Sequence, residues 1–133
     1  MSNNSSFTLP VLSHVSKSCI GVYVTIGQHT TRLFILNTAA PRSTLSSTLV
    51  HELYRANLII RTLRQDIYRL PNLSAYDRSQ HNHVLPDLTV RSDPRLATHR
   101  IEGQLGLDFF NHFELICFRR STSDLLLEPR PTP

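Results

Sequence analysis

Two short segments of this 133-residue chain share a pattern that restricts the folds open to it. In each, a few apolar residues run directly into small residues that favour a turn. The first segment is Phe34-Ile-Leu-Asn-Thr-Ala-Ala, and the second, about 65 residues later, is Gln104-Leu-Gly-Leu-Asp-Phe-Phe. A short apolar run bounded by turn residues is typical of a buried β-strand. We therefore expect two buried strands, each running into a turn.

The residues around these segments predict more short strands. The stretch 19–27 is rich in β-branched residues and ends at a glycine, so it predicts a hairpin with residues 32–36. Residues 114–118 and 124–128 are two apolar runs joined by a polar turn, which predicts a second hairpin. Residues 88–91 alternate in the manner of a further strand.

Two places favour helix. From residue 46 the apolar spacing changes, so that Leu49, Val50 and Leu53 fall on one helical face, with Ser46 or Ser47 as the cap. A short apolar helical turn follows Gly106. Residues 57–70 fit either helix or strand, and residues 71–87 predict a long loop or an exposed hairpin. Many short strands with two small helices predict an all-β fold, either a compact barrel or a sandwich.

Composition narrows the class of protein. Apolar residues make up 40% of the chain and charged residues 18%, as in a folded soluble protein. No apolar run approaches the roughly 20 residues that span a bilayer, and the first residues do not resemble a secretory signal. We therefore expect a cytoplasmic protein that does not bind membranes. Cys19 and Cys117 are then expected to be reduced, partly buried thiols.

The chain offers little basis for a metal, a cofactor or a nucleic-acid site. Neither cysteine belongs to a metal-binding pattern, and His81 and His83 lack a third ligand, so a surface loop explains the two histidines better. The net charge is +4, and all but one of the 14 basic residues are arginine. The arginines are scattered along the chain, so we interpret the charge as an aid to solubility rather than as a nucleic-acid surface.

The two segments of the opening pattern resemble the two sequence motifs of the retropepsin-like aspartic proteases. In that family an apolar run leads into Asp-Thr/Ser-Gly, and an apolar-apolar-Gly motif with a helix follows later. Here Asn37, Thr38 and Ala39 stand at the Asp-Thr-Gly positions, and Leu105-Gly106 matches the second motif. The resemblance implies a one-lobe, barrel-like acid-protease fold over residues 18–128. Residues 1–17 are then expected to be flexible or peripheral and residues 129–133 a proline-rich tail.

The resemblance also implies a peptidase function and the loss of its catalytic carboxylate. Members of this family form homodimers in which each lobe supplies one aspartate to a shared site. Two neighbouring carboxylates share one proton there and act as acid and base. Asn37 cannot take either role because a carboxamide does not ionise near neutral pH. The side chain of Ala39 also restricts the backbone where the family has glycine.

Further roles follow only from the resemblance. The Thr38 hydroxyl is expected to bond across the dimer axis, and Ala40 and Ser43 are expected to contact a bound peptide. A flap that closes over the peptide is expected within residues 66–86. The resulting hypothesis is a homodimeric, catalytically impaired homologue that binds an extended peptide or a protein.

Two alternatives remain open. The chain could be an active peptidase that takes its carboxylate from an Asp-bearing lobe on another chain. It could also be a small β-rich interaction or nucleic-acid module whose similarity to the family is accidental.

Overall fold

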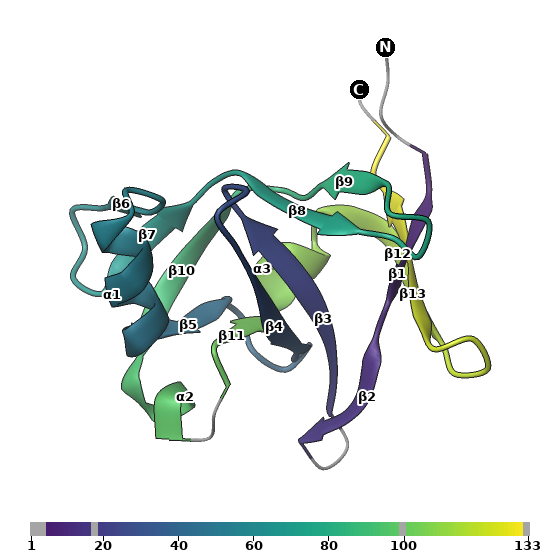
Figure 1. The fold of residues 1–133 in the computed structure, drawn as a ribbon, viewed down its shortest axis with the longest axis horizontal. Helices are drawn as coiled ribbons and strands as arrows, with labels where there is room; N and C mark the ends of the chain where they lie inside the picture. The colour runs from purple at the N-terminus through teal and green to yellow at the C-terminus, as the bar shows by residue number, and fades with distance from the viewer. Residues whose placement is uncertain (1–4, 17–18, 99–100, 132–133) are drawn as a thin grey trace.

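The computed structural model describes residues 5–16, 19–98 and 101–131 (Figure 1). Its elements, in chain order, are β1 (Phe7–Pro10), β2 (Leu12–Ser16), β3 (Cys19–Ile26), β4 (Thr30–Leu36), β5 (Thr44–Ser46), α1 (Ser47–Arg55), β6 (Ile60–Arg61), β7 (Ile67–Leu70), β8 (Leu73–Tyr76), β9 (Asn82–Val84), β10 (Leu88–Asp93), α2 (Pro94–Thr98), β11 (Gly103–Leu105), α3 (Leu107–Phe110), β12 (Phe113–Arg119) and β13 (Asp124–Pro129).

The described strands form two sheets (Figure 1). The larger has ten strands, nine of them in the order β6-β7-β10-β5-β11-β4-β3-β8-β9, with β2 also paired to β3. The smaller has the order β1-β13-β12. Strands β6 and β9 end the larger sheet without pairing to each other, so it does not close into a barrel. The predicted mainly-β fold is confirmed, with three short helices in the described residues rather than two.

The two motif segments lie side by side at the centre of the larger sheet. Strand β11 pairs in parallel with β4, with Gly103 opposite Phe34 and Leu105 opposite Leu36. On its other edge β11 pairs antiparallel with β5. Because parallel strands end at the same edge of a sheet, the turns that follow β4 and β11 come together. This pairing positions the candidate site.

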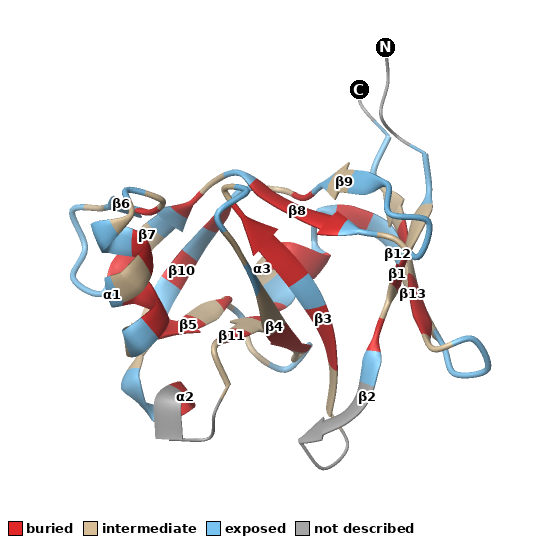
Figure 2. Cartoon of the chain, in the orientation of Figure 1, coloured by how far each residue is buried: buried red, intermediate tan, exposed pale blue. Residues whose placement is uncertain are grey.

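Helix α1 forms where the apolar spacing predicted it. The Ser46 hydroxyl accepts a hydrogen bond from the Leu49 amide at 3.1 Å, which satisfies one of the free amides of the first turn. Leu49, Val50 and Leu53 are all buried in the core. Figure 2 shows these buried positions along one side of the helix.

The ambiguous middle of the chain consists of strands. Residues 57–70 contain the β6–β7 pair rather than a helix, and residues 71–87 contain the hairpin β8–β9, whose first strand is largely buried. Residue spacing alone favoured neither state for residues 57–70. Pairing of β7 with β10, which lies about twenty residues later, is what favours the strand.

The N-terminal segment, which was expected to be flexible or peripheral, contributes the edge strand β1 to the smaller sheet. Strand β1 pairs with β13, which places Leu9 opposite Leu125. Leu9 and Val11 are buried, at 2% and 6% exposed. Pro129, the first residue of the expected proline-rich tail, is the last residue of β13. Residues 1–4, 17–18, 99–100 and 132–133 lie outside the described part of the chain.

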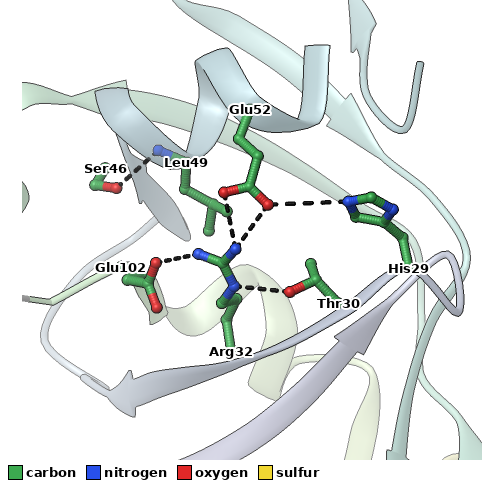
Figure 3. A network of polar contacts seen from close by, with 7 residues as sticks. All are labelled: His29, Thr30, Arg32, Ser46, Leu49, Glu52 and Glu102. Carbon is green, nitrogen blue, oxygen red and sulfur yellow. Dashed lines mark hydrogen bonds and ion pairs between the residues drawn. The ribbon is translucent and has the colours of Figure 1, made fainter. Parts of the chain in front are cut away.

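An arginine ties α1 to the central strands (Figure 3). Two oxygens of Glu52 on α1 accept from Nη2 of Arg32 at 2.8 and 2.6 Å, and Glu102 accepts from Nη1. The Arg32 Nε donates to the Thr30 hydroxyl at 2.8 Å. Burial acts to lower the pKa of Arg32, but the hydrogen bonds to Glu52 and Glu102 outweigh it and raise that pKa.

The two cysteines are free thiols. Cys19 is half-buried, as expected, whereas Cys117 on β12 is exposed. Among the described residues no helix has the length and apolar character needed to span a bilayer.

Candidate functional site

The candidate site begins at Asn37, the residue that follows β4. Its backbone amide donates to the Leu105 carbonyl at 2.9 Å, which extends the β4–β11 ladder by one bond. Its side-chain oxygen accepts from the Ala39 amide at 3.0 Å, and its carbonyl accepts from the Ala40 amide at 3.2 Å. The side-chain Nδ2 donates to Gln104 Oε1 at 3.3 Å. Asn37 therefore closes the turn with both its backbone and its side chain.

A buried serine and an aspartate join this turn to the second motif. The Ser43 hydroxyl donates to Asp108 Oδ1 at 2.7 Å and accepts from the Gly106 amide at 3.0 Å. The same Asp108 oxygen accepts from the backbone amides of Ser43 and Phe109. Ser43 is fully buried, so in the single chain its hydroxyl is committed to this network. The Ser43 side chain supports the turn from inside the protein and is not in contact with solvent.

Gly106 is required by close approach of the backbone. A Cβ built on it would lie 2.7 Å from the Ala40 carbonyl oxygen and 2.9 Å from two backbone atoms of Arg42. The Leu107 amide donates to the same Ala40 carbonyl at 2.8 Å. The first motif thus rests directly on the second, and only glycine leaves room for that contact.

Thr38 and Ala39 form the exposed tip of the turn. In the described residues the Thr38 hydroxyl makes no hydrogen bond within the chain. Ala39 is not among the described non-glycine residues with positive φ, so its Cβ causes no left-handed strain in this conformation. The exposed tip is therefore free to meet another surface.

A cavity of about 330 Å³ opens beside the turn. It lies across the neighbouring strands β7, β10, β5 and β11, which can be followed in Figure 1. Ala40 and Gln104, both hydrogen-bonded to Asn37, form part of its wall. The other lining residues are Pro41, Arg42, Thr44, Arg64, Ile67, Arg91, Asp93 and Arg95. Four of the ten lining residues are arginines and one is an acid.

Asp93 is ionised in this cavity. Hydrogen bonds from the side chain and backbone of Arg95 lower the pKa of Asp93, and the charge of Arg91 lowers it further. The Arg95 Nη2 lies 3.1 Å from Asp93 Oδ2. This ion pair offsets one positive charge and leaves three in excess.

The hairpin β8–β9 lies away from this cavity, although a flap was predicted within residues 66–86. Arg78 donates to the carbonyls of Thr122 and Ser123 in the β12–β13 turn. His83 stacks on Phe7 of β1, with ring centroids 4.4 Å apart. These contacts hold the hairpin against the smaller sheet. Of that predicted range, Ile67 lines the cavity.

The two histidines noted in the sequence share a carboxylate rather than a metal. His83 Nε2 lies 2.8 Å and His81 Nδ1 3.6 Å from the same oxygen of Asp77. No group of three or more His, Cys, Asp or Glu side chains with metal-binding geometry occurs among the described residues. The histidines thus stabilise the end of the hairpin.

The fold has a known counterpart. A crystal structure of a retropepsin-like aspartic protease from Rickettsia conorii superposes with a TM-score of 0.59 at 8% sequence identity. The match covers 99% of this chain and 98% of that chain. The single-lobe retropepsin fold is therefore confirmed. No protein-family model matches the sequence, and no curated protein matches it either.

The structure brings together most of the residues predicted for the site. Asn37, Thr38, Ala39 and Ala40 form one turn, and Leu105 and Gly106 contact it directly. The sequence interpretation missed the bonds between Asp108 and Ser43, the role of Gln104 as the partner of Asn37, and the grouping of the arginines. Pairing of β4 with β11 would have indicated Gln104, and the strand order β7-β10-β5-β11 would have indicated the arginines.

Proposed function

We propose that this chain is a homologue of the retropepsin-like aspartic peptidases that is catalytically impaired and keeps a peptide-binding cleft at a homodimer axis. The observation that carries the proposal is the position of Asn37. It follows β4 at the point where β4 and β11 end together, on a lobe whose fold matches a retropepsin-like protease.

The chemistry follows from the side chain at that position. Both polar atoms of the Asn37 carboxamide have partners, Ala39 and Gln104, and neither partner is an acid. No carboxylate hydrogen-bonds to the 37–39 turn among the described residues. In a symmetric dimer the shared site then has no group that can exchange a proton near neutral pH. General acid–base terms are worth about 10² to 10⁴ each in rate, so the loss removes most of the turnover.

Peptide binding needs none of these protons. An extended peptide can bind through main-chain hydrogen bonds, with its alternate side chains in pockets. The cavity beside Ala40 and Gln104 is one such pocket. The frame that holds the turn, made by Ser43, Gly106 and Asp108, is complete in the single chain.

The β6–β7 hairpin is the better candidate for a flap. Its strands pair through Ile60 and Arg69, and its connecting segment carries Leu63, which is completely exposed. Arg64 from the same segment lines the cavity beside the Asn37 turn. An exposed leucine on a hairpin tip gains apolar contact when the hairpin closes over a peptide. The proposed flap begins before residue 66 and overlaps the start of the predicted range 66–86 through β7.

The exposed tip of the turn supports a dimer axis. Thr38 and Ala39 are both exposed, and a hydroxyl without a partner in the described chain can bond to its own copy. The test is a Thr38→Cys variant, which should form a disulfide-linked dimer under mild oxidation, with sedimentation giving a dimer before oxidation. Wild type, with Cys19 and Cys117 only, and a Thr122→Cys variant are the matched controls. A monomer, or equal cross-linking at position 122, would contradict a shared axis at Thr38.

A further inference from the structure

We infer that the arginine-lined cavity beside the Asn37 turn binds the side-chain carboxylate of an acidic residue in an extended peptide. This inference rests on the proposed function, because it names the kind of peptide that the proposed cleft would select. It concerns the chemistry of one pocket, which is lined by residues from four separate segments of the chain.

The first observation is the excess of positive charge in a small space. Arg42, Arg64, Arg91 and Arg95 line one cavity of about 330 Å³, with Asp93 as the only acid among the lining residues. Like charges held this close repel each other, so an anion that enters lowers the electrostatic energy. Guanidinium groups also match a carboxylate in geometry, since each can donate two parallel hydrogen bonds.

The second observation is that part of this charge is uncommitted. Arg95 is bonded to Asp93, and the charge of Arg91 acts on the same carboxylate. The side chains of Arg42 and Arg64 form no hydrogen bond or ion pair with any described residue. Arg42 lies just after the Asn37 turn, and Arg64 lies on the β6–β7 hairpin, so the two reach the cavity from different segments of the chain.

The third observation is a hydroxyl that lacks a partner. Thr44 lines the cavity, and its Oγ1 is buried without a hydrogen bond among the described residues. Burying a hydroxyl in this state is unfavourable. A ligand atom whose entry exposes the Thr44 hydroxyl would therefore be stabilised by a bond that the free protein does not make.

The position of the cavity points to a peptide as the source of the carboxylate. Its wall includes Ala40 and Gln104, which are bonded to Asn37. A peptide lying along this turn would direct a side chain into the cavity. The cavity is a half-open hollow of about 330 Å³ between strands β7, β10, β5 and β11, so a single side chain fits it better than a nucleic-acid backbone does.

The test compares labelled ten-residue peptides that are identical except for Glu or Gln at one position, scanned along the peptide. Fluorescence anisotropy should show at least about tenfold tighter binding of the Glu peptide at one position, since one charge-assisted bond is worth that factor. The preference should fall as salt rises. Arg64→Gln should abolish it, and Arg64→Glu should reverse it towards a Lys peptide.

Arg120→Gln is the matched control, because it removes an exposed arginine of the β12–β13 turn that does not line the cavity. It should leave the Glu preference unchanged. Equal binding of the Glu and Gln peptides at every position would overturn the inference while leaving peptide binding intact. Loss of preference in Arg120→Gln as large as in Arg64→Gln would overturn it too, because the effect would then be one of net charge.

A second measurement separates this inference from the proposed function. The arginine Nε–H signals are followed by NMR during titration with N-acetyl-glutamate N-methylamide and with its glutamine analogue. Saturable shifts of Arg64 and Arg42 with the glutamate compound alone would support the anion site even if no peptide bound in the cleft. Absence of such shifts would contradict the anion site. If no peptide bound either, the proposed peptide-binding cleft would be contradicted as well.

Discussion

At position 37 the backbone and the side chain have separate tasks. The backbone amide continues the ladder between β4 and β11, and any residue can supply it. The side chain decides the chemistry: its oxygen accepts the hydrogen bond from the Ala39 amide, and its carboxamide does not titrate near neutral pH. An aspartate here could accept the same hydrogen bond and would add a titratable group. The backbone ladder and the proton chemistry therefore depend on different atoms of this residue.

Gly106, in contrast to Asn37, is expected to affect stability rather than chemistry. Gly106→Ala should lower the free energy of unfolding by about 2–3 kcal/mol, because its Cβ would overlap the backbone of Ala40 and Arg42. Urea denaturation followed by circular dichroism measures the change. Ser121→Ala, in the exposed turn after β12, is the control and should change stability by less than about 0.5 kcal/mol. Equal stability of the two variants would mean that the two motifs are not in contact.

At the scale of elements, a few charged side chains connect α1 and the hairpins to the sheets. Arg32 on β4 holds α1 through Glu52 and the start of β11 through Glu102 (Figure 3). Asp77 holds the end of the β8–β9 hairpin, and Arg78 attaches that hairpin to the smaller sheet. These contacts join elements that are distant in sequence. Loss of one contact should therefore loosen the whole helix or hairpin that it attaches.

Arg32→Met should destabilise the protein by about 1–2 kcal/mol, because charge-assisted hydrogen bonds are lost while Glu52 and Glu102 stay partly solvated. The double variant Arg32→Met/Glu52→Gln should recover part of this loss, since one unpaired carboxylate is removed. Thermal and urea unfolding measure both changes. Arg120→Met serves as the control for removing a positive charge. No recovery in the double variant would contradict a direct Arg32–Glu52 interaction.

The carboxylate of Asp77 gives a pH-dependent prediction. The hydrogen bond from His83 is the largest cause that lowers the pKa of Asp77 below its ordinary 3.8. The unfolded chain therefore takes up a proton at higher pH than the folded chain does, and this contribution to stability is lost as pH falls below about 5. The stability advantage of wild type over Asp77→Asn should shrink between pH 6 and pH 2.5 in urea titrations.

Asp66→Asn is the matched control, because Asp66 is exposed and its side chain has no hydrogen-bond partner among the described residues. Its stability difference from wild type should vary less with pH. A difference between wild type and Asp77→Asn that stays constant down to pH 2.5 would contradict the lowered pKa of Asp77.

At the scale of the whole molecule, the sequence predicted the elements whose contacts lie close together in the chain. The β3–β4 hairpin and the Ser46 cap of α1 follow from spacing and turn residues, and both were predicted. Strand β1 was not predicted because its partner, β13, lies at the other end of the chain. The arginines of the cavity look scattered because residues 42, 64, 91 and 95 meet only through the strand order β7-β10-β5-β11.

Within the site, the sequence predicted the two motif turns better than it predicted the flap. The two motifs indicated that the turns at Asn37 and Gly106 belong together, and the parallel β4–β11 pair brings these two turns into contact. The flap stays a prediction: no residue pattern distinguishes the β6–β7 hairpin from the β8–β9 hairpin, and the predicted range 66–86 includes strands of both. Their different contacts, with the cavity and with the smaller sheet, distinguish them.

The most direct test of the central claim compares peptide cleavage by wild type, Asn37→Asp and Asn37→Asp/Ala39→Gly between pH 4 and pH 7. Peptide mass spectrometry should first confirm that Asn37 is intact in wild type, and Asn111→Asp controls for an added carboxylate elsewhere. We predict no cleavage above background by wild type or Asn111→Asp. We predict at least about 10²-fold more by the Asn37→Asp variants. Pepstatin-sensitive cleavage by wild type, or no activity in either Asn37→Asp variant, would contradict the proposal that Asn37 occupies the catalytic position of an impaired peptidase.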